Sequence, residues 1–87
     1  MTFDEFKASG KNVSNLHDYN DFCEGPGRVY CNGALVIQCT ANWDGECKKS
    51  GKWFLSVRSQ QYQSDDLEEL EKELYEFAVD EDYTLEG

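Results

Sequence analysis

The chain has 87 residues and a formal net charge of −10, which suits a single domain, residues 1–87, with one modest core. The excess of acidic residues argues against direct binding to nucleic acid or to an anionic membrane surface. No apolar run is long enough for a signal peptide or a transmembrane helix, so we expect a cytoplasmic protein.

The first 24 residues are predicted to form a helical region. Thr2 followed by Glu5 matches a capping box and Gly10 is a stop signal, so a short helix is expected over residues 3–9. Apolar residues then recur at a spacing of three, which predicts one or two further helical turns. The residues at this spacing are Val13, Leu16, Tyr19 and Phe22.

Residues 28–58 follow a glycine–proline–glycine break and predict a three-stranded antiparallel sheet. The first two strands are expected over residues 28–31 and 34–40, joined by a two-residue type I′ turn at Asn32 and Gly33. This turn sets the register of the two strands. The pairs expected across it are Tyr30 with Leu35 and Val29 with Val36.

Residues 41–52 form a polar turn region with three lysines, and the third strand is expected over residues 53–58. Its alternation places Trp53, Leu55 and Val57 on one face of the sheet. Residues 59–63 are polar and are expected to lead into the last helix without structure of their own.

A long acidic helix is predicted over residues 65–79, followed by a loose tail over residues 83–87. Asp65 and Glu68 match a capping box at its start. Its apolar residues share one helical face; they are Leu67, Leu70, Leu74, Phe77 and Ala78. The order of helix, three strands and helix predicts an α+β fold, with the helical region and the acidic helix covering the sheet.

The opposite face of this helix carries a stripe of carboxylates. Pairs of like charge four residues apart cost about 0.2–0.5 kcal/mol each, and anions at a helix C-terminus oppose its dipole. Residues 1–63 have as many acids as bases, so residues 64–87 carry the net charge. We therefore expect a basic partner surface. The candidate partner-binding residues are Asp65, Glu69, Glu73, Glu76, Asp80, Glu81 and Asp82.

Residue types for catalysis or metal binding are few. His17 is the one histidine, so a catalytic dyad has no choice of base, and we expect no enzyme activity, cofactor or metal. Four cysteines, Cys23, Cys31, Cys39 and Cys47, could form two disulfides or, with His17, a zinc site. They lack the close pairs typical of zinc ligands. In a cytoplasmic chain we expect free, partly buried thiols.

Two interpretations of the acidic helix remain. In the first, its carboxylates mimic the phosphates of nucleic acid, because they recur about every 5 Å along the helix and phosphates recur about every 3.4 Å along one strand. In the second, the chain is an interaction module, such as an immunity, regulatory or phage structural protein. That module would bind through a sheet edge or the region of Trp43 and Trp53, with the acids providing solubility.

The layout of the chain resembles that of small acidic anti-CRISPR proteins encoded by phages, in particular α/β inhibitors of type I systems. The segments that carry the resemblance are residues 2–6 and 65–70, within a similar order of elements. The resemblance implies a DNA mimic in the bacterial cytoplasm whose partner is a subunit of the CRISPR surveillance complex. The stripe from Asp65 to Asp82 would then face the DNA-binding lysines and arginines of that subunit.

Overall fold

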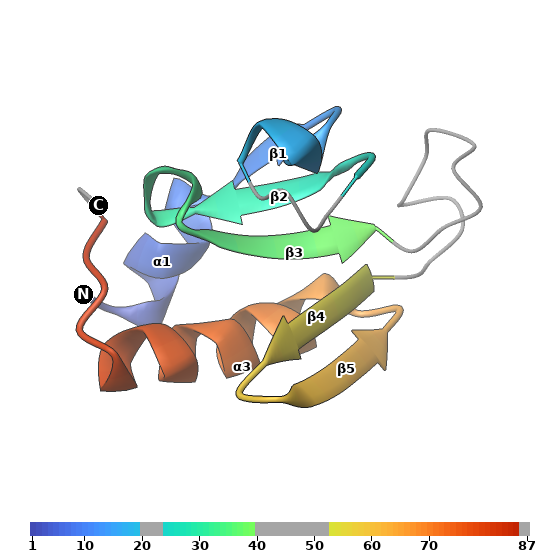
Figure 1. Cartoon of the computed structure of the whole chain (residues 1–87). Helices are drawn as coiled ribbons and strands as arrows, with labels where there is room; N and C mark the ends of the chain where they lie inside the picture. Colours follow the sequence, from blue (N-terminus) through green and yellow to red (C-terminus); the bar gives the residue numbers. More distant parts are fainter. Residues whose placement is uncertain (20–23, 40–52, 86–87) are drawn as a thin grey trace.

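The computed structural model describes residues 1–19, 24–39 and 53–85. They form a five-stranded antiparallel sheet with helices packed on one face (Figure 1). The strands, in sheet order, are β1 (Lys11–Val13), β2 (Gly27–Tyr30), β3 (Leu35–Cys39), β4 (Trp53–Val57) and β5 (Gln60–Ser64). The helices are α1 (Phe3–Ser9) and α3 (Leu67–Asp80), with 3-10 turns η1 (Leu16–Asp18) and η2 (Cys31–Gly33). The α+β class is confirmed, but the sheet has five strands instead of the three predicted.

The N-terminal region is only partly helical. The capping box of α1 is confirmed, since Thr2 Oγ1 accepts from Glu5 N at 3.1 Å and Thr2 N donates to Glu5 Oε1 at 2.7 Å. The predicted helical turns over residues 13–22 are wrong at their start, because Lys11–Val13 pairs with β2 as a strand. Backbone pairing with a sheet edge outweighs a weak apolar spacing. Phe22 lies outside the described residues.

The hairpin of β2 and β3 has the predicted register, with Tyr30 opposite Leu35 and Val29 opposite Val36. Its loop differs from the prediction, because it spans four residues, 31–34, instead of two. Cys31 and Asn32 have φ of 51° and 56°, and Gly33 has φ of 89°. Cys31 therefore joins Asn32 and Gly33 in the left-handed region, so the loop is longer than the predicted two-residue turn. The register of the two strands is nevertheless the predicted one.

Of the hairpin formed by β4 and β5, only β4 was predicted from the sequence. The inward face of β4 is confirmed, since Leu55 is buried and Trp53 and Val57 pack against the core. The expectation that residues 59–63 lack structure is wrong, because β5 pairs with β4 along its whole length. Arg58 and Ser59 form the two-residue loop, with φ of 52° and 63°, as in a type I′ turn.

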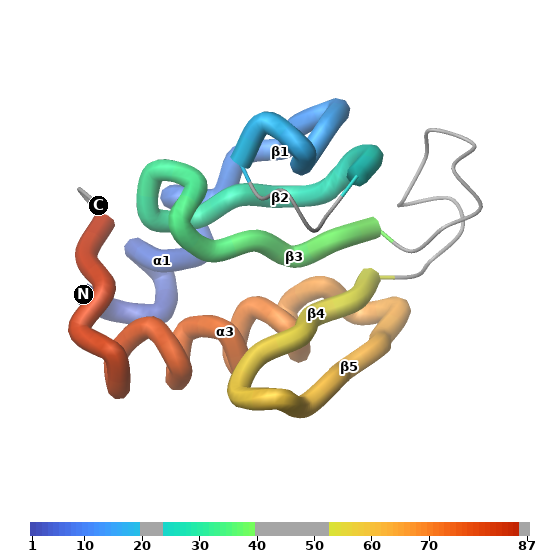
Figure 2. The backbone as a smooth tube through the Cα atoms, in the orientation of Figure 1, coloured from blue at the N-terminus to red at the C-terminus, as the bar shows by residue number. Residues whose placement is uncertain are grey.

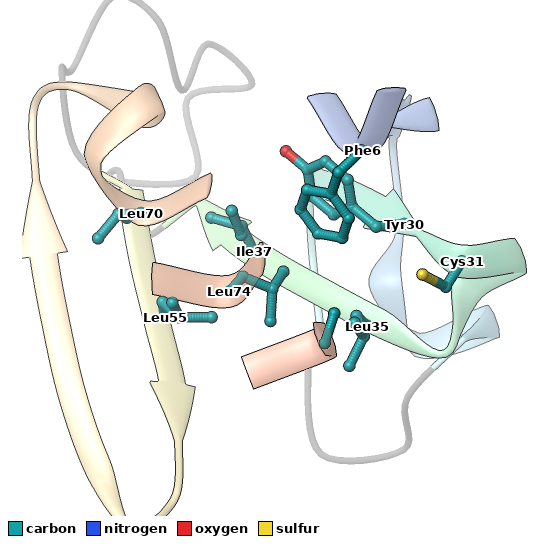
Figure 3. Close-up of a cluster of buried hydrophobic side chains, with 9 residues drawn as sticks. Phe6, Tyr30, Cys31, Leu35, Ile37, Leu55, Leu70 and Leu74 are labelled. Atoms are coloured by element: carbon teal, nitrogen blue, oxygen red, sulfur yellow. The ribbon is translucent and has the colours of Figure 1, made fainter. Parts of the chain in front are cut away.

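The core lies between the sheet and the two helices. Among the described residues, β3 and β4 pair through Gln38 with Phe54 and Cys39 with Trp53. The two strands diverge from that end, and α3 packs across the opening (Figure 1). Figure 3 shows Leu74 of α3 between Leu55 of β4 and the side chains of β3. On the other side of the core, the ring of Phe6 in α1 stacks on Tyr30 of β2 with a centroid separation of 4.7 Å.

The segment after α3 turns back toward the β2–β3 loop (Figure 2). Its Tyr83 N donates to Ala78 O at 2.9 Å, and the Tyr83 ring lies 6.0 Å from the Phe77 ring. Leu85 is partly buried. Residues 83–85 therefore pack against the body of the domain; residues 86–87 of the expected tail lie outside the described residues.

Candidate functional site

The acidic helix α3 is fixed to the core by its apolar face. Leu70, Leu74 and Ala78 are buried, and Leu67 and Phe77 pack partly against the same cluster. The predicted capping box at Asp65 is wrong: the N-cap is Asp66, whose side chain accepts from Glu68 N at 3.1 Å. Ser64 is the last residue of β5, and its hydroxyl accepts from Asp66 N at 2.9 Å. The N-cap therefore lies one residue later than predicted.

All seven candidate partner-binding residues are exposed. Glu73 and Glu76, in the middle of α3, form no ion pair or hydrogen bond within the part of the chain that the structure describes. Glu69 accepts from Ser64 Oγ at 2.8 Å, which ties its carboxylate to the end of β5. The helix therefore presents two unpaired carboxylates one turn apart, with a third held beside them.

Asp80 forms an ion pair with Arg58. Arg58 Nη2 lies 2.6 Å from Asp80 Oδ2, and the Arg58 guanidinium lies over the Phe77 ring at 5.2 Å. The hydrogen bond to Asp80 raises the pKa of Arg58. Arg58 thus offsets part of the negative field at the C-terminal end of the stripe.

The remaining three candidates lie beyond the ends of α3. Asp65 precedes the N-cap, whereas Glu81 and Asp82 follow the last helical residue, and Asp82 has φ of 59°. A helix of 14 residues is about 21 Å long, so Asp65 and Asp82 are too far apart to act on one small ligand. The stripe is an extended surface instead of a compact site.

Glu71 is a buried carboxylate that was not among the residues predicted from the sequence. Unlike the stripe, it is buried, with 6% of its surface exposed. Its Oε2 accepts from the Tyr30 hydroxyl at 2.6 Å and lies 4.0 Å from Arg28 Nε. The sequence did contain a signal, because position 71 is four residues after Leu67 and three before Leu74, on the apolar face.

The cluster around Glu71 continues across the sheet to β1. Arg28 Nε donates to the Tyr30 hydroxyl at 3.2 Å, and Arg28 Nη1 donates to Asn12 Oδ1 at 2.7 Å. Burial and the hydrogen bond to Glu71 raise the pKa of Tyr30. Gly10 lies against this cluster, since a Cβ there would approach Arg28 Nη2 to 2.5 Å. The four polar side chains bind α3 to β2 and β1.

The cysteines and the histidine that the structure describes are Cys31, Cys39 and His17. Cys31 is free and buried, and desolvation raises its pKa. Cys39 is disulfide-bonded, so the expectation of free thiols is confirmed for Cys31 and wrong for Cys39; Cys23 and Cys47 lie outside the described residues. His17 is exposed. Over residues 1–19, 24–39 and 53–85, no three His, Cys, Asp or Glu side chains are placed to hold one metal ion.

None of the described helices is long and apolar enough to cross a membrane. The polar face of α3 and the buried carboxylate of Glu71 both distinguish this helix from a membrane-spanning segment.

Compared with models of protein families, with curated proteins and with solved structures, the chain matches none.

Proposed function

We propose that the protein is a non-enzymatic inhibitor that mimics DNA and binds the basic, nucleic-acid-binding surface of a protein complex. The observation that carries this proposal is the pair Glu73 and Glu76, exposed and unpaired on a helix that three buried residues fix to the core. Because the helix backbone is already fixed, binding to a row of lysines and arginines orders only the exposed side chains. A mobile acidic tail would lose more conformational entropy.

The proposed mechanism is competition for a positively charged groove. Carboxylates along α3 would replace phosphates in contact with basic side chains, which releases the ions that screened both surfaces. The negative end of the chain would also speed association, and added salt would weaken it. Asp65, Glu81 and Asp82 would extend the contact beyond both ends of the helix, whereas Asp80 would contribute less because Arg58 already pairs with it.

The resemblance to anti-CRISPR proteins makes a type I surveillance complex the specific partner we propose. Its DNA-binding subunit offers the kind of basic surface that the stripe requires. The alternative is an interaction module unrelated to nucleic acid. In the structure Trp53, which that alternative invokes, packs partly against the core, and Trp43 lies outside the described residues.

The test compares three forms of the tagged protein that differ in charge placement. The stripe variant is Glu69→Gln, Glu73→Gln, Glu76→Gln. The control removes the same number of charges from exposed acids elsewhere, by Asp4→Asn, Asp18→Asn, Glu24→Gln. Each form is used to capture proteins from lysate of a CRISPR-bearing host, with elution by a salt gradient and identification by mass spectrometry. Circular dichroism checks that all three forms fold.

The proposal predicts that the wild type and the control capture a nucleic-acid-binding complex, and that the stripe variant does not. Duplex DNA added to the column should displace that complex, and moderate salt should release it. If all three forms capture the same partner, or if DNA leaves the partner bound, the acids provide only solubility. The alternative function would then be favoured.

A further inference from the structure

A cleft of about 360 Å³ opens at the end of the sheet near the β2–β3 loop. It lies on the face opposite the core, because Val29 lines it and alternates along β2 with the buried Tyr30. Lys11 lies directly opposite Val29 across β1 and β2, so both side chains project from the same face of the sheet. The cleft is therefore distinct from the acidic face of α3.

The other walls come from distant segments. The ring of Tyr19 lies against Gly33, where an added Cβ would approach Tyr19 Cδ1 to 2.4 Å. Tyr19 is 48% exposed, so part of its ring remains open to a ligand. Leu85, from the segment after α3, lines the cleft together with Asn32. The result is a hollow with an aromatic wall from Tyr19, apolar surface from Leu85, and Val29 at its floor, where only 4% of the Val29 surface is exposed.

Lys11 gives the cleft a cation without an internal partner. Lys7, Arg28 and Arg58 each lie within 4.0 Å of a carboxylate. Lys11 is exposed and has no ion pair or hydrogen bond from its side chain in the part of the chain that the structure describes. In a protein of net charge −10, anions are repelled in general, so an anionic group would favour a position beside an unpaired cation such as Lys11.

We propose that this cleft binds a small aromatic carboxylate. The carboxylate would lie at Lys11 Nζ, and the ring would pack against Tyr19 and Leu85 above the nearly buried Val29. Aromatic rings favour offset or tilted contacts with a tyrosine, and the volume is near the lower end of the range of about 300–1,000 Å³ found for ligand pockets. This inference is independent of the function proposed for α3.

The experiment is a titration of the full chain followed by two-dimensional ¹H–¹⁵N NMR. The ligands are indole-3-acetate and its neutral amide, which share one ring system and differ in charge. Both should shift the amide signals of Val29, Asn32 and Gly33, and the carboxylate should bind about threefold more tightly, the scale of an exposed ion pair. Raising the salt concentration should reduce that difference.

Two single substitutions locate the charge. Lys11→Met should bring the affinity for the carboxylate down to that of the amide. Lys72→Met removes a charge from an exposed lysine on α3 and should preserve the preference. Both side chains are exposed, so the spectra should retain the dispersion of a folded chain.

Each result decides one part of the proposal. If neither ligand gives saturable shifts at the cleft, there is no ligand site there. If the carboxylate and the amide bind equally, or if Lys72→Met abolishes the preference as fully as Lys11→Met does, then Lys11 does not recognise the anion. Any one of these three results overturns the proposal.

Discussion

The Tyr30 hydroxyl donates a 2.6 Å hydrogen bond to Glu71 Oε2, which joins the second strand of the sheet to the acidic helix. Tyr30 is fully buried and Glu71 nearly so, so water cannot replace either partner. A buried carboxylate is costly unless it is paired and hydrogen-bonded. This bond therefore acts together with the apolar contacts of Leu70 and Leu74 to determine which face of α3 turns inward, and so which carboxylates face the solvent.

Tyr30→Phe should lower the free energy of unfolding by about 1–3 kcal/mol, because it leaves the buried Glu71 without its hydroxyl donor. Urea denaturation measures this change. Glu71→Gln should also destabilise the protein, and the double variant should depart from additivity by about 0.5 kcal/mol or more, since the two side chains touch. The matched control is Glu73→Gln at an exposed position, expected within about 0.5 kcal/mol of wild type. Equal effects at 71 and 73 would contradict the prediction.

The same bond predicts a loss of stability in alkali. Burial raises the pKa of Tyr30 above its ordinary value of 10.0, so the folded state holds this proton more tightly than the unfolded state. The contribution is fully present below about pH 10 and is lost as the pH rises from there toward the folded pKa. Urea midpoints measured at rising pH should fall less steeply for Tyr30→Phe than for wild type. Parallel curves would exclude a linkage through Tyr30.

Cys31 should be unreactive in the folded protein. Its side chain is 1% exposed and desolvation raises its pKa, so little thiolate forms at pH 8 and little of it is accessible. Iodoacetamide labelling followed by peptide mass spectrometry should modify Cys31 in urea and leave it intact without urea. Rapid labelling of the native protein at Cys31 would show that the loop over residues 31–34 opens.

Substitutions in the Arg58–Asp80 pair distinguish the effect of charge on partner binding from an effect on the stability of the fold. Both side chains are about half exposed, so losing the pair should cost about 0–1 kcal/mol. Under the proposed function, Arg58→Gln adds to the negative field and should make the captured partner elute at higher salt. Asp80→Asn breaks the same pair and removes an acid, so its partner should elute at equal or lower salt. Identical shifts for both variants would exclude an electrostatic role for this end of the stripe.

The parts of the fold that follow hydrophobic periodicity could be predicted from the sequence. Leu70 and Leu74 mark the inward face of α3, and the register of Tyr30 with Leu35 follows from the position of the turn at Asn32. β5 could not be found in this way. Its five residues include one apolar side chain, Tyr62, and it is a strand because β4 beside it offers backbone partners.

The turn before β5 also lacked its usual signal. Arg58 and Ser59 occupy the left-handed region, which glycine and asparagine normally fill. The Arg58 contacts with Asp80 and Phe77 accompany that conformation. At the candidate site, the exposed carboxylates follow from the helical period. Glu71 was missed because its partners Tyr30 and Arg28 are some forty positions earlier in the chain, and only the packed structure brings them together.

The strand order of the sheet follows the chain from β1 to β5 without a crossover. Each strand can therefore pair with its neighbour in the sequence, and the β2–β3 and β4–β5 pairings close only short loops, which keeps the entropic barrier to forming these two hairpins low. The contacts that span the chain are those of α1 with α3, such as Phe6 with Tyr75 at 5.7 Å. We expect the hairpins to form early and the two helices to dock last, so the acidic surface acquires its fixed orientation in the final step of folding.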